Sequence, residues 1–219
     1  MSKTLPIKTL ILDFDGTIAD TKDGIVQTIQ ATLKELGIQS ANEAEIKNLI
    51  GLPLRETFTR AARLMDSGLL EIAVKLYRKK YNQIDLDTIK LFPNVKEVLK
   101  ELFDNGITIT VASGKGKDAL LTLSDKLEIS KYMTLIVGEQ DVKNGKPAPD
   151  MALLILEKTN SAAGKTLVVG DTVYDIAMGR AATCITCGAT YGNHSEAQIR
   201  GCNPDFVIRN FAEIVSIIK

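Results

Sequence analysis

Short β-branched and apolar runs alternate with amphipathic segments along most of this chain. The runs have the length and composition of buried strands, and the segments between them carry apolar residues at helical spacing. The expected strands lie at residues 10–12, 107–112, 135–137, 166–169, 184–186 and 206–208. Strands that alternate with helices form a parallel sheet with helices on both faces. We therefore predict an α/β fold with a Rossmann-like parallel sheet as its core.

A block of four amphipathic segments interrupts this alternation after the first strand. The expected helices lie at about 22–36, 43–50, 53–65 and 69–81, and Asn42 can cap the second of them. The chain of 219 residues is long enough for one full core and a small extra domain. We therefore predict an α/β core of residues 1–18 and 88–219, with a helical domain of residues 19–87 inserted after the first strand.

Composition argues against several classes of partner. Lys plus Arg and Asp plus Glu both number 27, so the formal net charge is zero. Nucleic acids and anionic membranes bind through positive charge, so neither is expected as the main partner. The first residues lack the apolar stretch of a signal peptide, and no apolar run is long enough to cross a membrane. We expect a cytoplasmic protein, as a monomer or a homodimer.

The three cysteines give no sign of a disulfide or a metal site. Cys184 and Cys187 have the spacing of a redox or zinc pair. However, they lie in an expected strand, where residues three apart point to opposite faces of the sheet. We therefore expect buried thiols in a reducing compartment.

Two carboxylates follow the first expected strand directly. Asp13 and Asp15 come after Leu12 and are followed by Gly16 and Thr17. Two carboxylates at the end of a buried strand repel each other, and burial makes it costly to keep them ionised. A divalent cation would compensate, and two acids can divide the work of nucleophile and proton donor. An ordinary Asp-Gly turn is the alternative interpretation.

Other polar residues follow the neighbouring expected strands. Ser113 follows the second strand, Lys146 lies in the loop after the third, and Asp171 and Asp175 follow the fourth. Ligands of open parallel sheets bind outside the carboxyl ends of the strands, so these side chains should converge. Each has an ordinary alternative, such as a turn residue, a solvated lysine or a helix cap. One shared site accounts for all of them together.

Phosphoryl transfer through an aspartyl-phosphate uses this set of groups. A carboxylate that attacks a phosphoester needs a cation to offset the repulsion between two anions, and Mg²⁺ suits carboxylate and phosphate oxygens. A hydroxyl and an ammonium group can hold the other phosphoryl oxygens. A second acid can protonate the leaving alkoxide and then activate water, which typically contributes about 10²–10⁴-fold.

The chain resembles the haloacid dehalogenase superfamily, in its Mg²⁺-dependent phosphatase branch. The resemblance covers the whole length and rests on four motifs in order: Asp13-Phe14-Asp15-Gly16-Thr17, Ser113, Lys146-Pro147, and Gly170-Asp171-Thr172 with Asp175. It implies a haloacid-dehalogenase-like core, with the helical insert as a small cap. Asp15 argues against a dehalogenase, which does not need this acid.

The resemblance also implies roles for the motif residues. Asp13 would be the nucleophile and Asp15 the general acid and base. The implied Mg²⁺ ligands are Asp13, the Asp15 backbone carbonyl and Asp171, with Asp175 supporting the metal site. The implied phosphate-binding residues are Thr17, Ser113, Gly114 and Lys146.

Within the superfamily, the chain looks most like the phosphoglycolate phosphatase group. The helical insert, Gly51-Leu52-Pro53-Leu54-Arg55 and Lys146-Pro147-Ala148-Pro149-Asp150 carry this likeness. Gly114 departs from it, because many members of that group have Asn at this position, which affects the substrate more than the chemistry. In the insert, Arg55 is expected to bind a carboxylate or a second phosphate through its planar fork, and an exposed helical arginine is the alternative.

Other functions remain open at this point. Within the superfamily they are a β-phosphoglucomutase-like sugar-phosphate mutase and an inorganic pyrophosphatase. Outside enzymes they are a phospho-receiver domain and a binding protein. A Ser-His-Asp hydrolase would have to use the only histidine, His194, together with Ser113, which lacks the glycine pattern of a nucleophile elbow. We expect His194 to lie in a surface loop.

Overall fold

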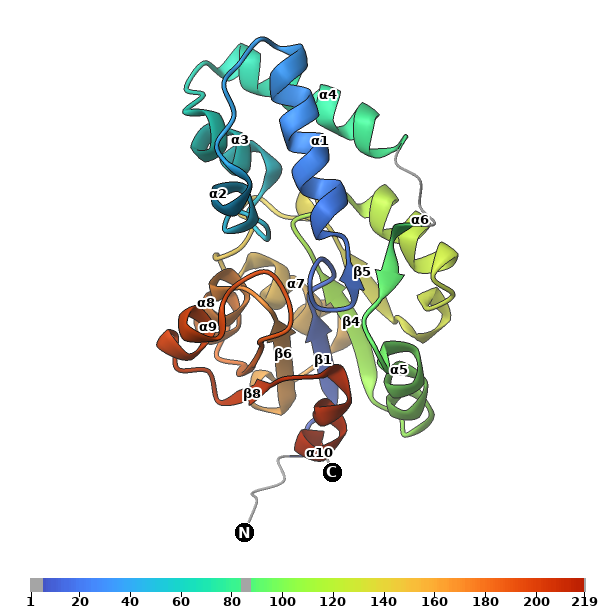
Figure 1. Cartoon of the computed structure of the whole chain (residues 1–219). Helices are drawn as coiled ribbons and strands as arrows, with labels where there is room; N and C mark the ends of the chain where they lie inside the picture. The colour runs from blue at the N-terminus through green and yellow to red at the C-terminus, as the bar shows by residue number, and fades with distance from the viewer. Residues whose placement is uncertain (1–5, 84–87, 219) are drawn as a thin grey trace.

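The computed structural model describes residues 6–83 and 88–218, and the expectations for residues 1–5, 84–87 and 219 lie outside these ranges. Six strands form one parallel sheet in the order β5-β4-β1-β6-β7-β8 (Figure 1). Their bounds are β1 Thr9–Leu12, β4 Thr108–Ala112, β5 Leu135–Val137, β6 Thr166–Gly170, β7 Ile185–Ala189 and β8 Phe206–Ile208. The predicted α/β fold with a parallel sheet is confirmed.

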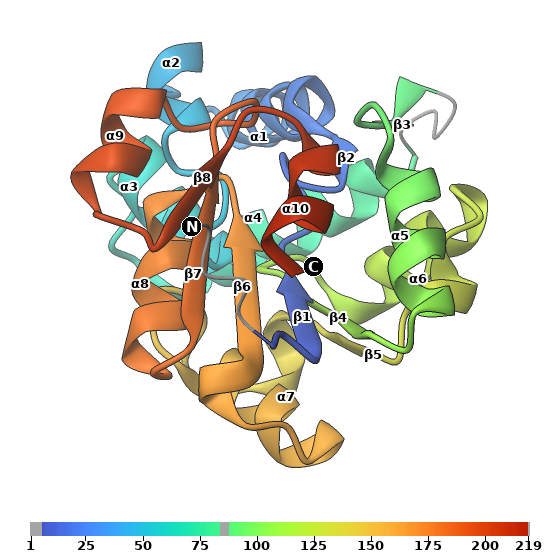
Figure 2. The same cartoon turned by 90° about the horizontal axis from the view of Figure 1, so that it is seen from below.

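Helices cover both faces of this sheet (Figure 2). Their bounds are α5 Val95–Asp104, α6 Lys117–Lys126, α7 Asp150–Thr159, α8 Val173–Ala181, α9 Glu196–Gly201 and α10 Ile214–Ile218. The side chains of strand β1 show why helices must pack on both faces of the sheet. Leu10 and Leu12 pack into the cluster that contains residues of α5, α6 and α10, whereas Ile11 packs into the cluster with residues of α7 and α8. All three side chains are fully buried, so the strand is apolar throughout.

Strand β1 lies at the point where the chain changes direction across the sheet. The chain passes from β1 to β4 and β5 on one side, and then to β6, β7 and β8 on the other side. Open parallel sheets bind ligands outside the strand ends at such a switch point. This topology therefore puts the end of β1 at the centre of the candidate site.

Strand β7 begins at Ile185, one residue later than expected, and it extends to Ala189. Cys184 and Cys187 pack into the clusters on opposite faces of the sheet, and both are buried free thiols. The prediction of two unconnected thiols is confirmed.

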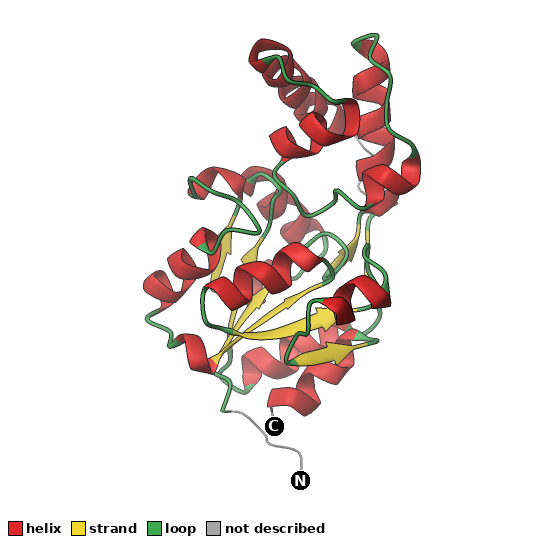
Figure 3. Ribbon diagram, turned by 90° about the vertical axis from the view of Figure 1, so that its left-hand side faces the viewer, coloured by secondary structure: helices red, strands yellow, loops and turns green. Residues whose placement is uncertain are grey.

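Four helices form a separate unit beyond the carboxyl ends of the strands (Figures 1 and 3). Their bounds are α1 Lys22–Glu35, α2 Glu43–Lys47, α3 Leu54–Ala62 and α4 Ser67–Tyr81, and we refer to residues 22–81 as the helical unit. The unit has its own apolar cluster, which includes the fully buried Leu33 and Phe58. None of the helices in the described ranges has the length and apolar content needed to cross a membrane.

Capping side chains set the ends of two of these helices. Asn42 caps α2 in a capping box with Glu45, as its sequence context predicted. Helix α4 begins at Ser67, two residues before the expected start at about 69, because the Asp66 carboxylate caps it by accepting a hydrogen bond from the Leu69 backbone N–H.

A small antiparallel pair of strands joins the helical unit to the rest of the chain. β2 (Ala19–Asp20) pairs with β3 (Lys90–Leu91), so the two chain segments that enter and leave the unit run side by side. The Phe92 N–H also donates to the Ile18 carbonyl at 3.1 Å. The sequence did not predict this pair, because two-residue strands carry no detectable periodicity.

Candidate active site

The carboxyl ends of the central strands bring the predicted polar residues together. Asp13 and Asp15 follow β1, Ser113 follows β4, Asp171 follows β6, and Lys146 reaches the same place from the loop before α7. Each of the five is less than 10% exposed. A buried cluster of ionisable groups is costly unless the groups are paired or bind a ligand, so their partners matter.

Lys146 is paired with two carboxylates. Its Nζ lies 2.5 Å from Asp13 Oδ1 and 2.6 Å from Asp175 Oδ1, and the side chain is fully buried. Burial opposes the charged form, but the two carboxylates outweigh it and raise the pKa of Lys146 above its ordinary value. The lysine is therefore a fixed positive charge beside Asp13.

One lysine does not balance the acids around it. Oxygens of Asp13, Asp171 and Asp175 lie within 4.8 Å of one another, and Asp13 Oδ2 has no hydrogen-bond partner among the described residues. Burial and the neighbouring carboxylates raise the pKa of Asp13 well above its usual range, although Lys146 acts in the opposite direction. Such a set of buried oxygen donors with excess negative charge fits a hard divalent cation.

Asp171 is held in place by a loop that follows β7. Asn193 donates to Asp171 Oδ2 from its backbone N–H at 2.6 Å and from its side-chain amide at 2.9 Å, and the Thr17 hydroxyl donates to Oδ1 at 2.9 Å. Burial and the charge of Asp175 nevertheless raise the pKa of Asp171 to about 7. In this structure the Thr17 side chain orients Asp171, and its binding of phosphate stays a prediction.

Gly16 is needed for this arrangement. Its φ of +96° is unfavourable for other residues, and a Cβ would lie 2.3 Å from Asp171 Oδ2 and 2.2 Å from the Asn193 amide nitrogen. The glycine after Asp15 therefore lets the chain turn while the carboxylate approaches its backbone.

Asp175 lies in the first turn of α8, and its carboxylate is bound by the N-cap residue Thr172. The backbone N–H and hydroxyl of Thr172 donate to its Oδ2 at 3.0 and 2.6 Å. Two ordinary interpretations of these acids are therefore wrong. Asp171 does not cap α8, because Thr172 is the capping residue, and Asp175 is not an exposed helical acid, because it is fully buried. The cap leaves Asp175 Oδ1 directed at Lys146.

Asp15 has two partners of its own. The Thr21 hydroxyl donates to Asp15 Oδ1 at 2.6 Å, and Lys115 Nζ lies 3.3 Å from the same oxygen. The Lys115 side chain is buried, and its ammonium group lies 4.0 Å from the centre of the Tyr81 ring in α4. Burial opposes the charge of Lys115, but Asp15 and the tyrosines outweigh this and raise its pKa.

Sequence reasoning missed Lys115 and Asn193 as residues of the site. Both lie just beyond a strand end, at Ser113-Gly114-Lys115 and in the loop after β7. The rule that pointed to Ser113 and Asp171 could have found them, since polar residues at parallel strand ends converge.

His194 lies in a loop, as predicted, but the prediction that this loop leaves it at the surface was wrong. The side chain is buried: its Nδ1 accepts a hydrogen bond from the Val173 N–H at 3.2 Å, and its Nε2 lies 3.1 Å from the Asn48 carbonyl oxygen. Burial lowers the pKa of His194 below its ordinary value. Both ring nitrogens are therefore occupied in linking α8 to the helical unit, and nothing pairs the ring with Ser113.

Ser113 and Gly114 form the other side of the site. The Ser113 hydroxyl is buried and accepts a hydrogen bond from the Lys115 N–H at 3.2 Å. A Cβ on Gly114 would lie 3.1 Å from the Leu52 carbonyl oxygen and 3.3 Å from that of Gly51. Gly114 thus allows the loop before α3 to approach the strand end closely.

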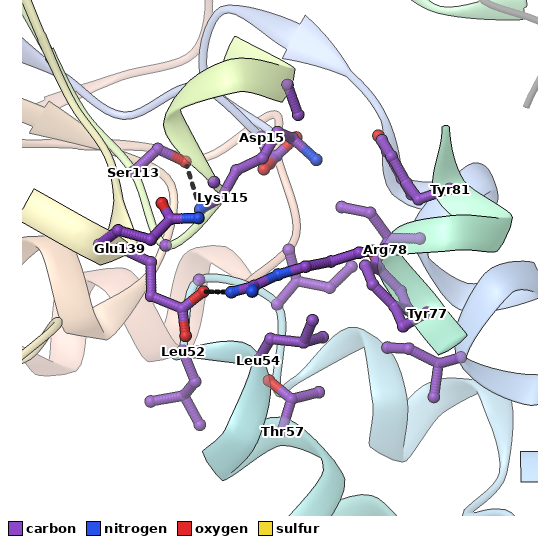
Figure 4. Close-up of a pocket in the computed structure, with 18 of the residues that line it drawn as sticks. Asp15, Leu52, Leu54, Thr57, Tyr77, Arg78, Tyr81, Ser113, Lys115 and Glu139 are labelled. Carbon is purple, nitrogen blue, oxygen red and sulfur yellow. Dashed lines mark hydrogen bonds and ion pairs between the residues drawn. The ribbon is translucent and has the colours of Figure 1, made fainter. Parts of the chain in front are cut away.

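A cavity of about 170 Å³ separates these groups from the helical unit (Figure 4). Asp13, Asp15 and Lys115 line it from the sheet, and α4 contributes Arg78, whose guanidinium pairs with Glu139 at 3.1 Å. Arg55, the predicted substrate-binding arginine, is not among the lining residues. It is exposed and pairs with Glu71 of α4.

Comparison with known proteins identifies the family of this chain. The family described as haloacid dehalogenase-like hydrolase matches residues 10–189. The Dickeya dadantii protein named "probable phosphatase IndB" is 31% identical over 209 residues, covering 94% of this chain and 91% of the relative. The phosphoglycolate phosphatase of Yersinia pestis is 32% identical over 223 residues, covering 100% and 96%.

A solved haloacid dehalogenase-like hydrolase from Bacteroides fragilis has the same fold, with a TM-score of 0.90 and 26% identity over 95% of this chain and 99% of that chain. The chain therefore belongs to the haloacid dehalogenase-like hydrolases. It is an enzyme of their phosphatase group and resembles the phosphoglycolate phosphatases, as its motifs indicated.

Proposed function

We propose that the protein is a Mg²⁺-dependent phosphatase that hydrolyses a small phosphorylated metabolite through an aspartyl-phosphate on Asp13. The observation that carries this proposal is the unpaired Asp13 Oδ2, in a buried cluster with Asp171 and Asp175 where Lys146 supplies one positive charge. The chain thereby offers a nucleophilic oxygen beside oxygen ligands that suit Mg²⁺. The carbonyl of Asp15 would complete the ligand set.

In the first step, an Asp13 carboxylate oxygen attacks phosphorus, and the bond between phosphorus and the ester oxygen breaks. Asp15 gives its proton to the leaving alkoxide. Ser113, the Gly114 backbone and Lys146 hold the phosphoryl oxygens, where charge is spread in the transition state. Bound Mg²⁺ would supply further charge neutralisation at these oxygens.

In the second step, Asp15 takes a proton from water as the water oxygen attacks phosphorus. The bond between Asp13 and phosphorus breaks, which releases inorganic phosphate and restores the carboxylate. The Thr21 hydroxyl and Lys115 hold Asp15 on the cavity side of the site, where it can serve both steps.

The helical unit is proposed to act as a cap, with the domain bounds predicted from the sequence. It would exclude water and select the leaving group, since it forms the far wall of the cavity beside Asp13 and Asp15. Phosphoglycolate, named for the Yersinia relative, is one candidate substrate. The cytoplasmic location stays a prediction.

The test is release of phosphate from a panel of small phosphoesters, with Mg²⁺ and with chelator. We expect Mg²⁺-dependent release by the wild-type protein and none by Asp13→Asn, with Asp23→Asn as the matched control because Asp23 is exposed on α1. Full activity of Asp13→Asn would contradict the assignment of the nucleophile. Stimulation by a sugar bisphosphate with little free phosphate would instead favour a mutase.

A further inference from the structure

The cavity beside Asp13 and Asp15 has an apolar far wall. The residues that form this wall are Ile25 and Ile29 of α1, Ile50 and Leu52 of the loop before α3, Leu54 of α3 and Tyr77 of α4. Figure 4 shows Leu52, Leu54 and Tyr77 on the side of the cavity away from Asp15. A group that leaves from phosphorus at Asp13 would face this wall.

The wall offers a ligand few free polar groups. Thr57 is a polar residue of α3 beside Leu54, and its hydroxyl already donates to the Pro53 carbonyl oxygen at 3.2 Å. A polar group of a ligand that lost its water against Ile25, Ile29 or Leu54 would find no hydrogen bond there to replace it. Apolar surface, by contrast, gains free energy when it is buried there.

The cations that line the cavity are already paired. In the part of the chain that the structure describes they are Arg78, which pairs with Glu139, and Lys115, which pairs with Asp15. Figure 4 shows the Arg78 side chain extended across the cavity to Glu139. Asp118 adds another acid to the lining, and Arg55 lies outside it. A second anionic group on the substrate would therefore compete with internal carboxylates for every lining cation.

We propose that the substrate is the phosphomonoester of an alcohol with an uncharged apolar or aromatic body, whose phosphoryl group is its only anion. The phosphoryl group lies among Asp13, Ser113 and Lys146, and the body of the leaving group packs on the wall of Ile25, Ile29 and Leu54. Phosphoglycolate and pyrophosphate carry a second anion and no apolar body, so they are poor substrates. This inference rests on the proposed phosphatase function.

The experiment compares three esters of primary alcohols and pyrophosphate with the Mg²⁺-loaded wild-type protein. The esters are benzyl phosphate, propyl phosphate and phosphoglycolate. Their leaving groups differ in apolar area and charge, and each leaving group departs as an alkoxide. We expect kcat/KM to fall in that order, with benzyl phosphate at least about tenfold above phosphoglycolate, given the usual gain from buried apolar area.

A matched pair of variants tests whether the apolar wall causes the preference for benzyl phosphate. Leu54→Asn should lower the ratio of kcat/KM for benzyl phosphate to that for phosphoglycolate by about fivefold or more. Ile72→Asn makes the same chemical change at an exposed position in α4 and should leave this ratio unchanged. Circular dichroism of both variants checks that they are folded.

The outcomes separate the two proposals. Mg²⁺-dependent turnover that favours phosphoglycolate or pyrophosphate over benzyl phosphate would overturn the apolar substrate class and leave the phosphatase mechanism intact. Equal effects of Leu54→Asn and Ile72→Asn on the ratio would overturn the role of the wall. No phosphate release from any of the compounds would overturn both the proposed function and this inference.

Discussion

Replacing Lys146 with Met should destabilise the protein strongly at neutral pH in the absence of metal. The methionine side chain is of similar length and fills the same space, but it leaves Asp13 and Asp175 without the ammonium group that lies 2.5 and 2.6 Å from them. Removing one partner from a buried ion pair costs about 3–5 kcal/mol. In a chain of this size each kcal/mol lowers Tm by about 2–4 °C, so we expect a fall of about 6–20 °C.

The assay is urea unfolding followed by circular dichroism, in chelator and at about pH 7.5. Lys158→Met is the control, because Lys158 is exposed and lies 3.6 Å from Glu157. An exposed pair of this kind contributes about 0–1 kcal/mol. The cost of Lys146→Met should shrink at about pH 5, because burial and the neighbouring carboxylates raise the pKa of Asp13 and favour its protonation when the lysine charge is absent.

A loss below about 1 kcal/mol for Lys146→Met at neutral pH would refute this reasoning, because it would show that the ammonium group does not stabilise the carboxylates beside it. A loss that is the same at both pH values would contradict the assignment of the cost to the Asp13 carboxylate.

Three further predictions follow from the same site. In chelator the wild-type protein should lose up to about 4 kcal/mol of stability between about pH 4 and pH 8. Folding raises the pKa of Asp171 from 3.8 to about 7, so protonation of Asp171 stabilises the folded protein at low pH and this contribution is lost as the pH rises. Unfolding free energies that rise with pH would contradict this, and Mg²⁺ should flatten the profile. Gly16→Ala should raise the Mg²⁺ concentration needed for activity, because the new Cβ would meet Asp171. Gly37→Ala is the control: Gly37 also has a positive φ but faces open space, so this change should lower stability without changing the Mg²⁺ requirement. Asp15→Asn should slow esters of poor leaving groups far more than phenyl esters, and equal losses on both would argue against the proton-donor role.

Much of the sheet could be predicted because its strands are short apolar runs bounded by turn residues. Residues 135–137 and 206–208 have the expected bounds, since apolar runs between turn residues mark such strands clearly. The β2–β3 pair could not be predicted, because its residues are held by neighbours distant in sequence and not by a local pattern.

The site shows the same division between local and distant information. Asp13 and Asp15 could be placed from the strand that precedes them, and the rule of converging strand ends then gathered Ser113, Lys146 and Asp171. That rule says nothing about how a helical insert sits over the sheet. The pairing of Arg55 with Glu71 and the burial of His194 against Asn48 both depend on that placement, which is why the sequence did not reveal them.

The close approach of Gly114 to the carbonyl oxygens of Leu52 and Gly51 has an evolutionary consequence. At this point the end of the sheet and the helical unit meet through main-chain atoms, so a side chain introduced at 114 requires the facing backbone to shift by a few tenths of an ångström. A change at this position therefore alters the spacing of the two parts together with the local chemistry. At the facing positions such as Leu54 and Tyr77, side chains of graded size and polarity alter the space for a ligand without moving the backbone contact.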